Sequence, residues 1–314
     1  MQKSKIFKPH VDAYAVNDLA RTDPQKLIDL SEARYRSQIS ELAEDFAAHF
    51  PKSRIILLSG PTSAGKTTTS HNLDTELEKR GIATFALSLD DFFFDRDKAP
   101  LLPDGTRDFE TPALIDIETL EGCLTELFRE GHADFPIFDF KVGRRSEQTF
   151  HYEYDDHTAI IIEGLHALNP MIAGRPFFRD AKKLYISIRA EFYEGVRRVL
   201  STRELRFIRR IIRDEHFRGS PPLSTMAMWK NVVDGEEKYI RPFRVDADKW
   251  IDSLHLYEPA LYRPIAEKLL APCLSHPQYG RQAPDLMERL SHFEPLPPVK
   301  IPRDSLMREF LEDF

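Results

Sequence analysis

The chain has 314 residues, which suits one large domain or one domain with appendages. Its 44 Lys and Arg residues against 51 Asp and Glu residues give a net charge of −7, which argues against bulk, sequence-independent binding of nucleic acid. A hydrophobic content of 41% excludes wholesale disorder, and the two cysteines, Cys123 and Cys273, exclude a disulfide framework or a cysteine-based metal site.

The first third of the chain predicts two helices and two strands. Residues 1–22 show no period, and we expect an extended arm there. An Asp-Pro pair, typical of an N-cap and first turn, opens a helix expected over 23–50. The apolar run 54–58 predicts a buried strand, a helix follows over 66–80, and a second strand follows over 82–88.

The remaining elements continue the alternation of helices and strands. Residues 95–112 are rich in Pro, Gly and Asp and predict a loop, and a helix follows over 118–130. The apolar runs 158–162 and 184–188 predict two more buried strands. This alternation indicates an α/β fold with a parallel sheet that has helices on both faces.

A glycine-rich segment lies between the strand 54–58 and the helix 66–80. It reads Gly-Pro-Thr-Ser-Ala-Gly-Lys-Thr and fits the phosphate-loop pattern G-x-x-x-x-G-K-[ST] in its required context. The glycines let backbone N–H groups turn toward phosphate oxygens, and the helix N-terminus favours an anion. Lys66 can reach the β- and γ-phosphates, and the Thr67 hydroxyl can bind Mg²⁺. We therefore expect ATP and Mg²⁺ as cofactors, and the expected ATP-binding residues are Gly60, Pro61, Thr62, Ser63, Ala64, Gly65, Lys66, Thr67 and Thr68.

Carboxylates follow two of the predicted strands. Asp90 and Asp91 follow the second strand, and because ligands bind at the carboxyl ends of parallel strands, we expect both in the crevice of the phosphate loop. One of them could accept a proton from an attacking hydroxyl and help to place Mg²⁺; a solvated helix N-cap is the alternative. Glu163 ends the strand 158–162 and is expected to hold Mg²⁺ directly or through water. For the nearby His166 we favour a structural role.

Eight arginines lie within residues 197–218 of this acidic chain. On a helical wheel Arg206, Arg210 and Arg213 share one arc and apolar residues share another, which predicts an amphipathic helix. Three interpretations follow: a lid that neutralises a triphosphate, a solvated face, or an RNA-binding stripe. We favour the lid, because the helix is expected to break near Arg218 into a mobile loop.

Taken together, these motifs resemble those of the uridine kinase and phosphoribulokinase family of P-loop kinases, and most closely its bacterial uridine kinase-like nucleoside kinases. The resemblance runs from about residue 23 to the end of the chain, with the motifs in the same order. The matching stretches are 60–68, 88–93, 108–110, 136–141, 162–170, 209–214, 217–219, 228–229 and 235–238.

The resemblance implies a P-loop NTPase fold of class α/β, with helices on both faces of a parallel sheet and an arginine-rich helical lid. We expect an N-terminal helical extension over 1–52 and a kinase core over 53–275, with the lid around 203–240. Residues 276–314 are expected to form a proline-rich strap and a short helix.

The resemblance also implies roles for single residues. Asp90 matches the catalytic base, and Phe109 and Glu110 match an aromatic and acidic pair beside the nucleoside, whose acid bonds the ribose hydroxyls. Arg210 matches a residue that reaches the acceptor. The expected catalytic residues are Lys66, Asp90, Arg213 and Arg218. The expected metal ligands are Thr67, Asp90 and Glu163. The expected acceptor-binding residues are Asp90, Phe109, Glu110, Phe138, Arg145 and Arg210.

The sequence departs from the family where pyrimidine nucleoside kinases read the base edge with a Tyr and a His. The matching residues here are Phe138, which lacks a hydroxyl, and Gly143, which has no side chain. The implied reaction is transfer of the γ-phosphoryl of ATP to a hydroxyl, first of all the 5′-OH of a nucleoside such as uridine or cytidine. A kinase for another metabolite alcohol (pantothenate, glycerate or a sugar phosphate) and an ATP-binding regulatory or RNA-interacting protein remain the alternatives.

The expected partner is a small-molecule acceptor. The N-terminus has no apolar signal segment and no apolar run approaches the ~18 residues that cross a membrane, so we expect a cytoplasmic protein without a membrane partner. The acidic net charge disfavours nucleic acid, and a homo-oligomer is compatible with the sequence.

Overall fold

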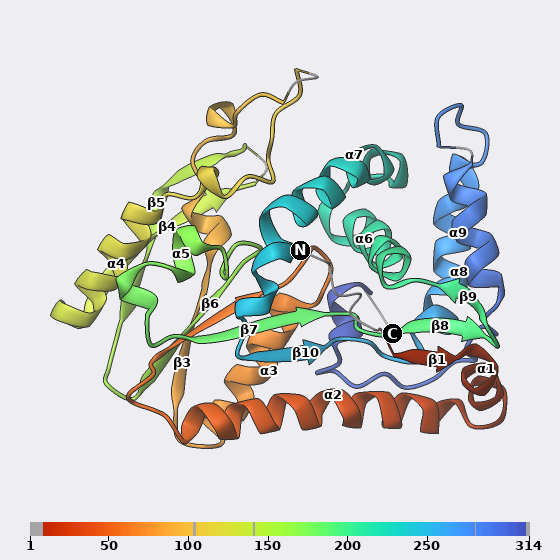
Figure 1. Ribbon diagram of the computed structural model, residues 1–314, viewed down its shortest axis with the longest axis horizontal. Helices are drawn as coiled ribbons and strands as arrows, with labels where there is room; N and C mark the ends of the chain where they lie inside the picture. The colour runs from red at the N-terminus through yellow and green to blue at the C-terminus, as the bar shows by residue number, and fades with distance from the viewer. Residues whose placement is uncertain (1–8, 103–104, 141, 280, 312–314) are drawn as a thin grey trace, which may run out of the picture.

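Five parallel strands form the central sheet, in the order β10-β7-β2-β6-β3 (Figure 1). The computed structural model describes residues 9–102, 105–140, 142–279 and 281–311. Every neighbouring pair in this sheet is parallel, so all five carboxyl ends lie at one edge. The strands are β2 (Ile55–Ser59), β3 (Ala83–Ser88), β6 (Thr158–Glu163), β7 (Lys182–Ser187) and β10 (Lys249–Asp252).

Both faces of the sheet are apolar, because successive side chains of each buried strand point to opposite sides. Ile56 and Leu58 of β2 pack into a core with the helices α2, α3, α6 and α8. Ile55 and Leu57 pack into a second core, to which α4 and the strand β4 contribute. In Figure 1, α2 runs along one side of the molecule beneath the sheet. The helices are α2 (Pro24–Ala47), α3 (Lys66–Glu78), α4 (Ile117–Glu130), α6 (Thr202–Arg218) and α8 (Glu258–Leu270).

The predicted helices and strands of this sheet layer are confirmed to within a few residues. The expected helix N-cap is confirmed: the Asp23 carboxylate accepts a hydrogen bond from the Lys26 N–H at the start of α2. Gly131 ends α4 in the left-handed conformation, with φ +79°. The two-sided apolar pattern of the strands therefore predicts the class α/β and helices on both faces.

The expectation of an extended arm over residues 1–22 is wrong. His10–Asp12 forms β1, which pairs in parallel with β8 (Glu191–Glu194), and Ala13–Thr22 forms the helix α1. The Asp12 carboxylate caps α1, and its buried residues are Ala13, Val16 and Ala20, a helical spacing of small side chains. This spacing of i, i+3 and i+7 is itself a helical period, which the expectation of an arm overlooked. Residues 1–8 lie outside the described part of the chain.

Two antiparallel hairpins were not predicted. The strands β4 (His132–Asp139) and β5 (Arg144–Glu153) pair over one end of the sheet, and Pro136 within β4 hides its strand pattern. The strand β9 (Arg197–Leu200) pairs with β8, so the first two arginines of the arginine-rich segment belong to a strand rather than to the helix.

The expected lid is a pair of helices. After α6, Gly219 adopts φ +57° and α7 (Pro222–Gly235) begins three residues later. Ser220 N–H donates to the Asp214 carbonyl at 2.9 Å, which closes the end of α6. The expected mobile loop after Arg218 is therefore wrong: the break is a short, hydrogen-bonded turn between two helices.

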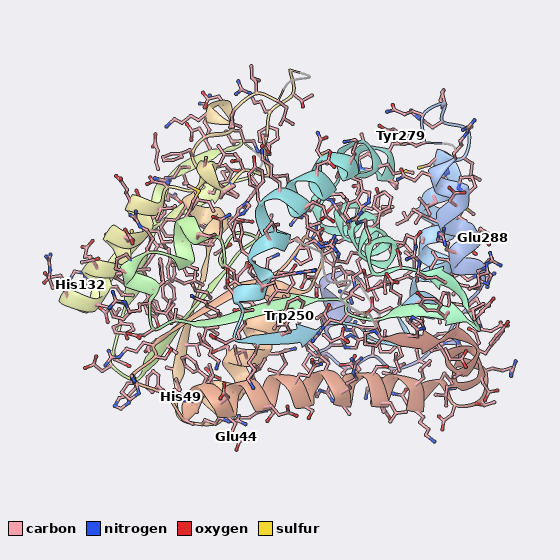
Figure 2. All side chains as sticks on the ribbon, viewed as in Figure 1. Glu44, His49, His132, Trp250, Tyr279 and Glu288 are labelled. Carbon is pink, nitrogen blue, oxygen red and sulfur yellow. The ribbon has the colours of Figure 1, made fainter. Side chains whose placement is uncertain are left out.

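The C-terminal segment adds a helix that was not predicted, α9 (Gln282–Ser291), before the irregular strap and a short 3-10 helix at Leu306–Glu309. Side chains fill the space between these layers (Figure 2), where Trp250 of β10 stacks at an angle on Tyr185, with ring centroids 5.0 Å apart. A further short α-helix is α5 (Pro170–Ala173). Among the described residues, we find no helix both long and apolar enough to span a bilayer.

Candidate active site

The loop between β2 and α3 lies at the carboxyl edge of the sheet and is tightly constrained. Gly65 is the N-cap of α3 and adopts φ +94°, which a residue with a side chain rarely adopts. A Cβ on Gly60 would lie 2.4 Å from the carbonyl oxygen of Ile186, so only glycine allows this close approach to β7. Lys66 bends back and its Nζ donates to the Gly60 carbonyl at 3.3 Å.

This loop offers polar groups that fit a polyphosphate. The Ser63 hydroxyl is buried without a hydrogen-bond partner, and its residue has φ +56°, which is uncommon for a non-glycine residue. The side chain of Thr67 is exposed at the first turn of α3, where N–H groups and the helix dipole favour an anion.

The sheet register brings Glu163 to the same edge as the loop. Glu163 is paired with Ser88 of β3 on one side and with Leu58 of β2 on the other. The Ser88 hydroxyl donates to Oε1 of Glu163 at 3.4 Å. Burial raises the pKa of Glu163 to about 7, although the nearby charge of Lys66 acts in the opposite direction.

Asp90 and Asp91 follow β3 in a short 3-10 helix, and their surroundings differ. Burial raises the pKa of Asp90, while the positive charges of Lys66 and Arg218 act to lower it. Asp91 instead accepts a hydrogen bond from the backbone N–H of Phe138 at 3.1 Å and so holds β4 against the sheet edge. Of the two, Asp90 is therefore the carboxylate that faces the cations of the site.

The helix α6 lies directly on the phosphate loop. Arg206 donates to the carbonyl of Thr62, and Arg209 donates to the carbonyl of Ser63, both at 3.2 Å. Arg210 donates to the Thr62 hydroxyl, also at 3.2 Å. Because Arg206 and Arg209 are buried, the interpretation of this segment as a solvated face is wrong for its central arginines.

Asp214 gathers the arginines at the end of α6. This carboxylate is buried and accepts from Arg210 at 3.1 Å and from Arg213 at 2.8 and 3.1 Å. Arg218 forms a looser ion pair with it, at 3.8 Å, and remains 60% exposed. Sequence reasoning gave Asp214 no role, although its position four residues after Arg210 and four before Arg218 is the spacing of helical ion pairs.

Arg209 anchors α6 to the rest of the protein. Its guanidinium and the carboxylate of Glu258 are both fully buried and form a bidentate ion pair. The same guanidinium donates to the Ser253 carbonyl at 2.7 Å. Arg209 is therefore a structural member of the arginine-rich segment, whereas Arg197 and Arg203 form exposed ion pairs with Glu288 and Glu237.

A second feature of the site is a cavity of about 450 Å³, whose wall includes Glu110 and Arg218, two charged groups that interact with Asp90. Aromatic rings form much of its wall, and Phe138 meets Phe93 edge to face with centroids 5.9 Å apart. Charged side chains from the lid and from the loop 95–112 also reach it. The expected site residues that line it are Phe109, Glu110, Phe138, Arg210 and Arg218.

The end of α7 meets Glu110 at this cavity. Burial raises the pKa of Glu110 to about 7, opposed by the charge of Arg210. A Cβ on Gly235, at the end of α7, would lie 2.3 Å from the Cβ of Glu110, so only glycine lets the two segments meet. Tyr239, in the turn that follows, donates its hydroxyl to Asp108 at 2.8 Å. Sequence reasoning assigned no role to Gly235 or Tyr239.

His166 lies buried between the segments that carry Glu110 and Tyr239. It is only 2% exposed, and it faces the backbones of Glu110 and Tyr239. Burial lowers the pKa of His166 to about 4, so the imidazole is neutral at physiological pH. The surroundings fit the structural role favoured from the sequence.

Arg145 lies apart from the other expected acceptor-binding residues. Its guanidinium forms an ion pair with Asp116 at 3.2 Å and donates to the Phe92 carbonyl at 3.3 Å. It is not part of the cavity wall. These contacts fix β5 against the start of α4.

Arg96 takes the space at Gly143. Gly143 adopts φ +75°, and a Cβ there would lie 2.6 Å from Cδ of Arg96. Arg96 lines the cavity beside the buried ring of Phe138. At the position that matches the base-reading His, the side chain of an arginine from the loop 95–112 therefore takes its place. Lys141, at the end of the matching stretch 136–141, lies outside the described residues.

Comparisons with known proteins show the family and the fold of this chain. The model of the phosphoribulokinase / uridine kinase family matches residues 55–257. The chain belongs to this family. A uridine kinase of Bacillus pumilus is 28% identical over 197 residues, which cover 62% of this chain and 83% of that protein. A uridine kinase of Staphylococcus haemolyticus is 28% identical over 198 residues, which cover 62% of this chain and 84% of that protein.

Among solved structures, a putative fructose transport system kinase from Silicibacter sp. is similar with a TM-score of 0.50 and 18% identity. The similarity covers 68% of this chain and 98% of that one. It shows the shared fold, and together with the family match it confirms the P-loop kinase fold expected from the motifs.

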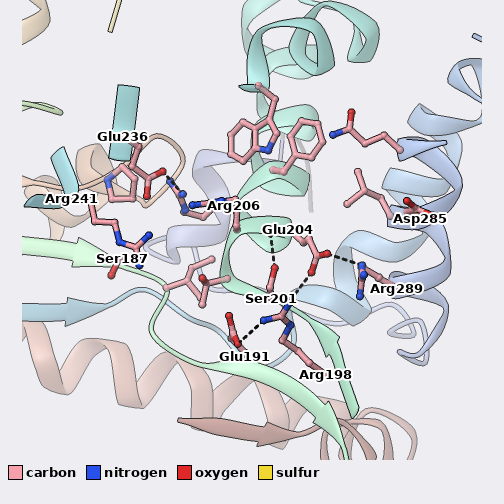
Figure 3. A pocket seen from close by; sticks show the side chains of 18 of the residues that line it. Ser187, Glu191, Arg198, Ser201, Glu204, Arg206, Glu236, Arg241, Asp285 and Arg289 are labelled. Atoms are coloured by element: carbon pink, nitrogen blue, oxygen red, sulfur yellow. Dashed lines mark hydrogen bonds and ion pairs between the residues drawn. The ribbon is translucent and has the colours of Figure 1, made fainter. Parts of the chain in front are cut away.

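Another cavity, of about 500 Å³, lies on the other side of α6 in this kinase, beside Pro61 (Figure 3). Six arginines line it, and carboxylates face them: Arg289 pairs with Glu204 at 2.6 Å, and Arg206 pairs with Glu236 at 2.5 Å. These pairs tie the start of α6 to α9 and to the end of α7.

Removing the Arg209 guanidinium should destabilise the protein strongly. We expect Arg209→Met to lower the free energy of unfolding by about 3–5 kcal/mol, because it leaves the Glu258 carboxylate buried and unpaired. The matched control Arg203→Met removes an exposed arginine from the same helix and should cost less than ~1 kcal/mol. Urea unfolding of both variants measures the difference; equal losses would contradict the assignment of Arg209 as the anchor.

Glu110 should make the stability of the ligand-free protein depend on pH. Burial raises its pKa to about 7 in the folded state, against an ordinary value of 4.5, so the folded protein keeps a proton that the unfolded chain releases between these values. The free energy of unfolding should therefore fall as the pH rises from about 4.5 to 7, by about 1–3 kcal/mol for this group. Glu110→Gln should reduce this fall in denaturation measured at pH 5 and pH 8. An unchanged slope would show that Glu110 titrates normally.

Proposed function

We propose that this protein transfers the γ-phosphoryl group of ATP to the 5′-OH of a nucleoside. The observation that carries the proposal is the position of Asp90: its carboxylate interacts with Lys66 of the phosphate loop and with Arg218, and Arg218 also lines the aromatic cavity. The relatives in the family that are uridine kinases support a nucleoside acceptor.

The phosphate loop binds the donor. Backbone N–H groups of residues 62–66 and the ammonium of Lys66 hold the phosphates, and Arg213 and Arg218 neutralise charge from the lid. Thr67, Glu163 and Asp90 would hold Mg²⁺, which supplies charge neutralisation at the phosphates. In the described residues, no three His, Cys, Asp or Glu side chains are grouped so as to hold a metal by themselves; magnesium in kinases is usually held by one or two carboxylates together with the substrate phosphates.

Asp90 acts as the general base. The hydroxyl oxygen of the acceptor forms a bond to the γ-phosphorus, its proton passes to Asp90, and the bond from the γ-phosphorus to the bridging oxygen of ADP breaks. The raised pKa of Asp90 makes it a better proton acceptor near neutral pH, and Lys66 and Arg218 favour its charged form. Most of the remaining rate enhancement comes from positioning and charge stabilisation.

The aromatic cavity supports a planar acceptor. A nucleobase can stack on the rings around Phe138, and Glu110 can accept hydrogen bonds from ribose hydroxyls. A small polyol such as glycerate would leave the aromatic wall in contact with water. Because Phe138 has no hydroxyl, Arg96 is the polar group that replaces the base-reading side chains of pyrimidine kinases. The RNA-binding alternative is disfavoured, since Arg206, Arg209 and Arg213 are buried.

Removing the carboxylate of Asp90 should stop phosphoryl transfer without loss of ATP binding. We expect Asp90→Asn to lower kcat by about 10²–10⁴-fold, the usual size of a general-base contribution. Asp91→Asn is the matched control: its amide oxygen can still accept from Phe138 N–H, and we expect a loss below about tenfold. Steady-state kinetics with a calorimetric ATP titration separate the two effects. Loss of ATP affinity with turnover retained would assign Asp90 to structure or metal binding.

The acceptor class can be tested with a panel of compounds. ADP release is measured with purine and pyrimidine nucleosides, pantothenate, glycerate and sugar phosphates, with Lys66→Ala as the inactive control. We expect turnover that depends on a nucleoside and is abolished in Lys66→Ala. Turnover with another alcohol and with no nucleoside would refute the nucleoside assignment. ADP release without dependence on any acceptor would favour a regulatory NTPase.

A further inference from the structure

The C-terminal 3-10 helix lies against the phosphate loop. Oε2 of Glu309 accepts from the Thr68 hydroxyl at 3.0 Å and lies 3.4 Å from the Thr68 backbone nitrogen, whose N–H it also accepts. Leu306 covers Gly65 from behind, since a Cβ on that glycine would lie 2.4 Å from Cδ1 of Leu306. A segment about 240 residues distant in sequence thus forms one wall of the loop.

The backbone of this segment is firmly held. Ser305 donates to the buried carboxylate of Glu32 at 2.5 Å. The buried ring of Phe310 lies under the guanidinium of Arg209, 5.1 Å from the ring centroid. Glu309 itself is only half-buried. Its side chain can therefore move while the segment stays in place.

Thr68 N–H lies in the first turn of α3, where a phosphate loop offers its backbone N–H groups to the α- and β-phosphates. A carboxylate and a phosphate oxygen cannot both accept the hydrogen bonds of Thr68, and their like charges repel. The charge of Glu309 also reaches the neighbouring carboxylate, because it contributes to the raised pKa of Glu163.

We propose that Glu309 occupies a phosphate position of the nucleotide site and must leave Thr68 when a nucleotide binds, so that this residue sets the affinity for the nucleotide. The proposal rests on the proposed function, in which this loop binds ATP. It extends that function by a residue that lies outside every motif of the sequence and acts as a built-in competing anion for ATP and ADP. The acceptor cavity is not part of the competition, since Glu309 is not in its wall.

The test compares nucleotide binding in the full-length protein with Glu309→Gln. The amide keeps the size of the side chain and removes the charge. Calorimetric titration with ATP and with ADP, in Mg²⁺, should give dissociation constants about tenfold lower than in the unchanged protein, the usual effect of one charge-assisted hydrogen bond. The Michaelis constant for the acceptor should stay the same. Glu294→Gln is the matched control, because it removes an exposed carboxylate of the same C-terminal strap and should leave both constants unchanged.

Thermal unfolding and a second variant, Glu309→Ala, show whether any effect comes from misfolding. Tighter binding in both folded variants supports the competition. If the wild-type protein binds ATP and Glu309→Gln binds it equally well or more weakly, the competition is overturned and the proposed function still stands. If neither protein binds ATP, the proposed function fails, and this proposal fails with it.

Discussion

The docking of α6 on the phosphate loop is the contact on which the rest of the site depends. Arg206, Arg209 and Arg210 reach the backbone and side chain of residues 62–63, so helix and loop form one unit. The buried pair of Arg209 with Glu258 fixes this unit to α8. Asp214 pairs with Arg210, Arg213 and Arg218, and two of these, Arg210 and Arg218, line the aromatic cavity. Burying charge so deeply is tolerable only because each group has partners.

The carboxylates of the site differ from its arginines, because nearby charges of opposite sign compensate their burial only in part. Asp90, Glu110 and Glu163 lie in a desolvated edge, and their pKa values are raised because burial outweighs the nearby cations. Raised values of this kind are typical of groups that exchange protons or bind cations during a reaction. The site thus joins tightly paired arginines of α6 to acids that nearby cations only partly compensate.

The sequence predicts the parallel sheet, its main helices and the loop, because these depend on local patterns: two-sided apolar strands, caps and the spacing of 60–67. It does not predict contacts between distant segments. The roles of three residues follow only from the folded structure. Asp214 pairs with arginines of α6, Gly235 of α7 lies against Glu110, and Glu309 of the C-terminal strap contacts the phosphate loop helix at Thr68. The expectation of an arm over residues 1–22 was wrong although the local pattern was present, since Ala13, Val16 and Ala20 follow a helical spacing after the capping Asp12.

A crystal structure with Mg²⁺, a non-hydrolysable ATP analogue and a nucleoside is the measurement that tests this kinase assignment most directly. We predict phosphates on the loop with the terminal one between Lys66 and Arg213, the nucleoside hydroxyl at Asp90, and Glu309 turned away from Thr68. An analogue bound in the arginine-lined cavity beside α9, with the phosphate loop empty, would contradict it.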